Sequence, residues 1–140
     1  MAHRHIVYMM LADSAAQARD IATAQRYSTL LEELATRDNH QPYLAVAHRS
    51  FGIICRLNEE FAEAEVRLTQ ALEVFEEFQA HWQTGRTLVE LAELSRAQSD
   101  VNGARDYLTR ALVEFEVIKA LPAIERAQET LQELEVLLNE

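Results

Sequence analysis

The sequence is poor in the residues that interrupt helices or cross-link chains. Its 140 residues include three glycines, two prolines and one cysteine. A single cysteine excludes an internal disulfide framework. Because glycine and proline break helices and form turns, their scarcity favours long helices. No segment alternates β-branched or aromatic residues with polar ones, as a half-buried strand would. We therefore expect an all-α protein.

Positive charge is also scarce. The formal net charge is −10, and Lys119 is the one lysine beside twelve arginines. This balance argues against a nucleic-acid partner, which needs a basic surface, and against adhesion to an anionic membrane. No run of about 18 apolar residues could span a membrane, and no signal peptide is recognisable near Met1. We expect a cytoplasmic protein without nucleic-acid or membrane partners.

The chain repeats itself with a period of forty residues. Residues 68–80 and 108–120 are identical at seven of their thirteen aligned positions. Chance gives about one match over this length. A fixed period of this size indicates a repeat architecture, in which one supersecondary unit stacks on its copies.

Residues at forty-residue spacing indicate what the unit is. Acidic residues cap helix N-termini, proline fits the first helical turn, and small residues let two helices approach closely. Each period therefore predicts a helix, a tight turn, a second helix and another tight turn. These sets are Asp20, Glu60 and Asp100; Pro42, Trp82 and Pro122; Ala12, Gly52 and Ala92, which follow Leu11, Phe51 and Leu91; and Ala24, Ala64 and Ala104.

The period predicts seven helices in one domain, residues 1–140. Three helix pairs are expected at about 3–38, 42–79 and 82–119, followed by an unpaired helix at 122–139. Apolar residues keep helical spacing from Phe61 to Phe78 and again from Val101 to Ile118. The expected helices span residues 3–17, 20–37, 42–58, 60–79, 82–98, 100–119 and 122–139.

These residues resemble the tetratricopeptide repeat (TPR) family. Residues 58–64 are similar to that family's turn, in which an acidic residue and an aromatic residue precede the alanine of the second helix. The resemblance covers residues 5–139. It implies an α-solenoid of antiparallel helix pairs, a right-handed superhelix whose concave face usually binds a peptide or protein segment. Further matching positions are Phe51, Gly52, Leu68 and Ala71, and one period later Leu91, Ala92, Asp100, Ala104, Leu108 and Ala111.

The sequence also departs from the TPR pattern. Its period is 40 instead of 34, Ser28 and Leu31 replace the expected large and small residues of the first repeat, and Glu76 and Glu116 replace a proline. This long repeat is similar to the form found in large bacterial transcriptional regulators and signalling ATPases.

The two terminal helices leave alternatives open. The apolar residues of 122–139 form a narrow stripe, with the remainder polar, which suits either a cap on the repeat stack or a seam with another chain. Apolar residues wrap the helix at 3–17 from Ile6 to Leu11. Its outer side either lines a groove or contacts another chain, or the chain is part of a longer array.

No catalytic or metal-binding motif is present. The three glycines lie too far apart for a phosphate loop, and His3 and His5 lack the i, i+3 or i, i+4 spacing of a helical metal pair. We expect Cys55 to be buried as a small apolar residue, His48 to be packed between helices, and His40 and His81 to lie in turns. The sequence therefore predicts no enzyme, no cofactor and no metal.

The TPR resemblance places a candidate partner-binding face on the first helix of each pair. The lysine and asparagine positions that clamp a peptide carboxylate in chaperone-type members are not kept here, so that clamp is absent. The face has an apolar patch at one end and four arginines. Either these arginines bind carboxylates of a partner, or Arg86 and Arg96 pair with Glu90 and Glu93 on their own helix. The candidate residues are Ile6, Met9, Met10, Asp13, Val46, Arg49, Ile53, Arg56, Arg86, Val89, Glu93 and Arg96.

The favoured function is a non-enzymatic protein-interaction module or scaffold that binds a peptide or helix with apolar and acidic residues. The alternative is homo-oligomerisation, through the first or last helix, or a regulatory segment of a larger bacterial transcriptional or signalling regulator. An enzyme would require a deep polar pocket with strongly perturbed ionisable groups.

Overall fold

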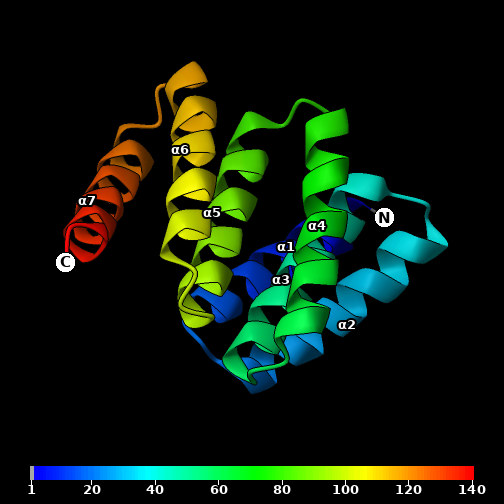
Figure 1. The fold of residues 1–140 in the computed structure, drawn as a ribbon. Helices are drawn as coiled ribbons and strands as arrows, with labels where there is room; N and C mark the ends of the chain where they lie inside the picture. Colours follow the sequence, from blue (N-terminus) through cyan, green and yellow to red (C-terminus); the bar gives the residue numbers. More distant parts are fainter. Residues whose placement is uncertain (1) are drawn as a thin grey trace. The chain divides into compact units, whose positions relative to one another are not determined.

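The fold is all-α, as predicted. A computed structural model describes residues 2–140, with side chains from Arg4 onward. Over that range it contains seven α-helices and no strand (Figure 1). Every predicted helix boundary lies within two residues of the observed one. The helices are α1 (Ala2–Gln17), α2 (Ile21–Arg37), α3 (Gln41–Leu57), α4 (Phe61–Glu77), α5 (His81–Ala97), α6 (Val101–Val117) and α7 (Leu121–Leu138).

The helices form two compact units, whose boundary falls within α4. The N-terminal unit is Met1–Val74 and the C-terminal unit is Phe75–Glu140. In the N-terminal unit α2 packs against α1 and α3, and α1 also contacts α3; in the C-terminal unit α6 packs against α5 and α7. Within the C-terminal unit, α6 runs antiparallel to both α5 and α7 (Figure 1). The predicted single domain stays a prediction.

One backbone turn recurs at the end of six helices. Its middle residue has a positive φ, between 51° and 62°, although none of the six is glycine. The next residue donates its N–H to the carbonyl five residues earlier, as Asp100 does to Ser95 at 2.8 Å. This is the Schellman arrangement, which satisfies the free carbonyls at a helix C-terminus. The positive-φ residues are Arg19, Asn39, Glu59, Gln79, Ser99 and Lys119.

These turns explain the forty-residue period. The positive-φ residues are spaced twenty apart, so each helix and its turn use twenty residues and a pair uses forty. The expected N-caps are confirmed at two starts: Thr23 N–H donates to Asp20 Oδ1 at 3.3 Å, and Gly103 N–H donates to Asp100 Oδ1 at 2.9 Å. Pro42 and Pro122 lie in first turns as predicted.

The small residues at equivalent positions let neighbouring helices approach, as expected. A Cβ added to Gly52 would lie 2.6 Å from Cγ of Leu68 on α4, and one added to Gly85 would collide with the ring of Phe115 on α6. Real Cβ atoms do not come this close, so an alanine at either position would require the facing side chain or its helix to shift. The alanines at 12, 24, 64, 92 and 104 are completely buried.

The predicted ends of two helices were wrong. We expected Phe78 and Ile118 on the apolar faces of helices reaching 79 and 119, but α4 ends at Glu77 and α6 at Val117. The positive φ of Gln79 and Lys119 turns the chain, and both apolar side chains are left exposed.

The positive-φ turns predict a gain in stability from glycine at one position and a loss at its neighbour. We expect Ser99→Gly to raise the free energy of unfolding by about 0.5–1 kcal/mol, because glycine adopts φ 62° without steric cost. Gln98→Gly, where φ is −96°, is the matched control and should lower it by a similar amount. Urea unfolding measures both; a loss for Ser99→Gly would contradict this account.

Candidate functional site

The candidate face of α1 carries an outward apolar stripe. Ile6, Val7, Met10 and Leu11 are 41%, 49%, 61% and 38% exposed, respectively. Their i, i+1, i+4, i+5 spacing puts them on one side of the helix. The opposite side packs inward through Ala12, Ala15 and Ala16, which are buried. Of the predicted residues, Ile6 and Met10 therefore belong to this outward stripe, whereas Met9 is half-buried.

Three of the predicted residues on α3 are inside the protein. Val46, Arg49 and Ile53 are 2% or less exposed. Ile53 packs with Ala15, Ala16, Ala24 and Ile54. Arg56 is half-buried. A role for these four residues in partner binding stays a prediction, but the buried ones stabilise the fold in the state described here.

Arg49 is a fully buried cation on α3. Its Nη2 lies 3.5 Å from Oδ1 of Asp13 on α1, and the Asp13 side chain is 24% exposed. Two predicted site residues thus contact each other. A buried charge must be compensated, because desolvating an ion costs several kcal/mol. This contact joins α1 to α3.

On α5, the predicted residues are less buried. Arg86, Val89 and Glu93 are half-buried and Arg96 is exposed. Arg96 Nη1 lies 3.3 Å from Glu93 Oε1 on the same helix, and Nη2 lies 3.8 Å from Glu133 on α7. One of the two alternatives for these arginines, pairing along their own helix, is therefore confirmed for Arg96.

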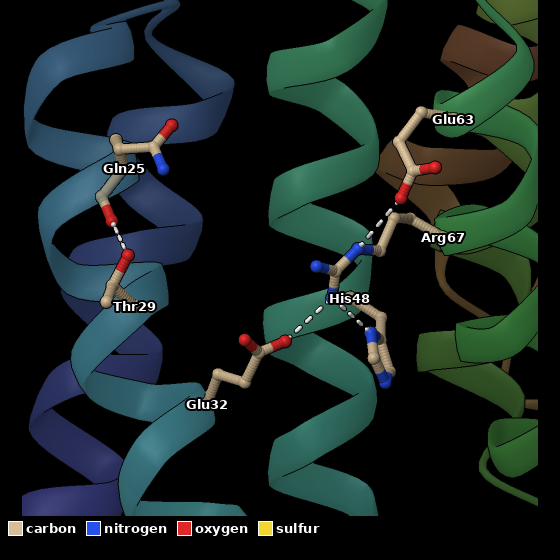
Figure 2. Close-up of polar contacts among 6 residues, drawn as sticks. All are labelled: Gln25, Thr29, Glu32, His48, Glu63 and Arg67. Carbon is tan, nitrogen blue, oxygen red and sulfur yellow. Dashed lines mark hydrogen bonds and ion pairs between the residues drawn. The ribbon is translucent and has the colours of Figure 1, made fainter.

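A polar cluster joins α2, α3 and α4 in the N-terminal unit (Figure 2). Arg67 on α4 donates from Nη1 to Glu32 Oε2 on α2 at 2.7 Å, and the same nitrogen lies 2.9 Å from Nδ1 of His48 on α3. Its Nε lies 3.5 Å from Glu63 Oε1, and its guanidinium carbon lies 4.7 Å from the centre of the Phe51 ring. We call Glu32, His48, Glu63 and Arg67 the His48 cluster.

The geometry of the His48 cluster fixes the state of its imidazole. A guanidinium has only donors, so Nδ1 of His48 must accept and the ring proton must sit on Nε2. Burial lowers the pKa of His48 below its usual 6.5, and the positive charge of Arg67 lowers it further, against a smaller opposing effect of Glu32. The prediction that His48 packs between helices is confirmed by these contacts.

A second histidine cluster lies where α1 meets the α2–α3 turn. The rings of His5, His40 and Tyr43 are mutually adjacent: Tyr43 is stacked against His5 at a centroid distance of 5.0 Å and against His40 at 4.1 Å, and the two histidine rings are 5.5 Å apart. His5 is buried, and its Nε2 lies 3.3 Å from Asp38 Oδ2, although the angle is not that of a hydrogen bond. A hydrogen bond from Arg37 lowers the pKa of Asp38, with a smaller effect of His5. The side chain of His3 lies outside the described residues.

The smaller expectations have different outcomes. His40 lies in the turn before α3 as expected, and as the N-cap it accepts from Tyr43 N–H at 3.3 Å. His81 was expected in a turn but is the first residue of α5, with Nδ1 2.6 Å from Glu114 Oε2. Cys55 is only half-buried, and burial raises the pKa of its thiol. Outside its buried stripe α7 is not wholly polar, because it exposes Leu121, Val136 and Leu137.

Within residues 2–140, no helix combines the length and apolar character that crossing a membrane requires. Among the described side chains, no three histidine, cysteine or acidic groups are placed to hold a metal ion.

Comparison with protein-family models and with curated proteins gives no match. Sixteen chains of solved structures are similar in fold, among them BtubC (BKLC) from P. vanneervenii. That alignment covers 96% of this chain and 64% of the BtubC chain, with 15% identity and a TM-score of 0.64. The likeness shows a helical-repeat fold. This chain therefore spans less than two thirds of the length of BtubC.

The burial of Arg49 predicts that it stabilises the fold. We expect Arg49→Met to lower the free energy of unfolding by about 2 kcal/mol, less than for a fully buried pair because Asp13 is partly exposed. Arg96→Met is the matched control. Its ion pairs lie at the surface, so it should cost no more than about 0.5 kcal/mol. Equal small losses in urea unfolding would show that Arg49 contributes little to stability.

Proposed function

We propose that this protein is a non-enzymatic interaction module of the TPR kind, and that it binds an apolar segment of a partner protein. The outward stripe of α1 is the observation that carries this proposal. Four large apolar side chains on one side of a helix form a surface that soluble proteins rarely leave uncovered unless it is used. The two adjacent methionines, Met9 and Met10, adapt to partner side chains of different shape.

The register of the repeat supports a helix as the bound segment. Val7 and Leu11 hold the positions that Ala47 and Phe51 hold forty residues later in α3. Ala47 is completely buried and Phe51 half-buried there, next to neighbouring helices. In α1 the same positions are exposed. A partner helix would bury them as the packing of the repeat buries their counterparts.

The acidic character expected of the partner depends on the arginines. Arg49 and Arg96 already lie next to carboxylates of this chain. The partner is therefore proposed to be mainly apolar along α1. A cytoplasmic location is part of this proposal.

The second candidate is homo-oligomerisation, with the chain serving as a regulatory segment of a larger bacterial protein. The observation that favours it is the exposure of Leu121, Val136 and Leu137 on α7, in addition to the stripe of α1. A second copy of the chain could bury such exposed apolar side chains, which is the driving force for association.

A pair of charge substitutions on the stripe tests the interaction. We expect Ile6→Asp/Met10→Asp to abolish capture of one identified partner from an extract of the source cells. The matched control is Val113→Asp/Val117→Asp on α6, which has the same i, i+4 spacing and similar exposure, 59% and 57%. The control should retain the partner, because it changes charge equally at another surface. Recovery of that partner with both variants would rule out the stripe as its binding site.

Light scattering separates the two candidates. If the wild-type chain is an oligomer that Ile6→Asp/Met10→Asp converts to a monomer, the stripe serves homo-oligomerisation. A wild-type monomer at high concentration removes that candidate.

A further inference from the structure

We propose that the His48 cluster is a pH-sensitive connection that holds α4 to α2 and α3 while His48 is neutral and releases α4 when His48 is protonated. The cluster spans three helices of the N-terminal unit, and all of its residues are described (Figure 2). The proposal is independent of the function proposed above.

The connection depends on one nitrogen of Arg67. Nη1 lies 2.7 Å from Glu32 Oε2 on α2 and 2.9 Å from His48 Nδ1 on α3, so this group joins α4 to both neighbours. The ion pair of Arg67 with Glu63 lies within α4. Losing the contacts of Nη1 would therefore remove this ionic link between α4 and the two other helices.

Protonation of His48 opposes these contacts in two ways. Nδ1 can no longer accept once it carries a proton, and two donors with positive charge then face each other at 2.9 Å. The imidazolium also competes with Arg67 for Glu32, whose charge acts on His48 in this structure. Glu32 can thus pair with His48 instead, so that α2 stays on α3 and α4 is released.

Other ionisable groups lie on α3 and on the helices next to it, outside the His48 cluster. On α1, Asp13 is near Arg49, which follows His48 in sequence but pairs on the α1 side. Further along α3, Cys55 is influenced by Glu60, Glu63 and Arg67, which places its thiol on the side of α3 that faces α4. The groups that face His48 itself are Glu32 from α2 and Arg67 from α4, with Glu63 beside Arg67.

The next repeat carries hydrophobic residues at the same sequence positions. Forty residues after Glu32, His48 and Arg67 stand Leu72, Leu88 and Tyr107. These three registers therefore accept apolar side chains, and the ionic set is not required by the fold. Replacing a buried or half-buried ionic set with apolar residues is often neutral or stabilising. The apolar variant is accordingly Glu32→Leu/His48→Leu/Arg67→Tyr.

Histidine nitrogen NMR on the intact chain tests the first step. We expect neutral His48 to carry its proton on Nε2 and to titrate below pH 6.5. In Arg67→Tyr its pKa should rise, because the neighbouring positive charge is gone. Arg110→Gln, a surface change in the C-terminal unit, is the control and should leave it unchanged. A proton on Nδ1, or a titration at or above pH 6.5 in the wild type, would overturn the proposal.

The rate at which a disulfide reagent labels Cys55 tests the release of α4. The rate is divided by that of the urea-unfolded chain at the same pH, which removes the intrinsic pH dependence of the thiol. We call the inverse of this ratio the protection of Cys55. Between pH 7.5 and pH 5 this protection should fall, by up to about tenfold for each pH unit that separates the pKa of His48 in the closed state from its pKa in the open state. The apolar variant should show no such fall. Equal pH dependence in wild type and apolar variant, or constant protection in both, would contradict release of α4.

Discussion

The constraint on which this structure depends is the three-residue turn that ends α1 to α6. Each turn places a non-glycine residue at positive φ, and each is followed twenty residues later by the next. Because helix length and turn geometry are both fixed, every position keeps its register through the chain. Register then decides packing. The positions of Ala12, Gly52 and Ala92 always meet a neighbouring helix at close range, which is why none carries a large side chain.

At some positions the residue type differs from that at the equivalent positions of the other repeats, and these differences change the local contacts between helices. Gly52 lies against Leu68, whereas Ser28, which stands in the register of Leu68 one repeat earlier, is a buried hydroxyl without a hydrogen-bond partner. Arg67 stands where Tyr27 and Tyr107 stand in the other repeats. A regular scaffold can accept such changes because each affects only adjacent helices.

The helices and turns could be predicted because their signals are local. Asp20, Asp100, Pro42 and Pro122 act on backbone groups within three residues, and the apolar spacing depends on the helix alone. The contacts of the candidate site could not be predicted, because they join residues that are far apart in the sequence. Arg67 is 35 residues from Glu32, and Asp13 is 36 from Arg49. The pairs within one helix were the parts visible from the sequence: Glu63–Arg67 at i, i+4 and Glu93–Arg96 at i, i+3.

Because Arg49 is buried and Ile6 and Met10 are exposed, the outward stripe of α1 is a better candidate than Arg49 for a surface that selects a partner. A residue inside the protein can select a partner only if the fold opens, which costs free energy on every binding event. Burying an exposed apolar side chain against a partner stabilises the complex by about 25 cal/mol per Å² of apolar surface removed from water. The stripe of α1 therefore has the advantage over the buried arginine as a binding surface. Arg49 and Asp13 contribute indirectly, because their contact joins α1 to α3 and so supports the helix that presents the stripe.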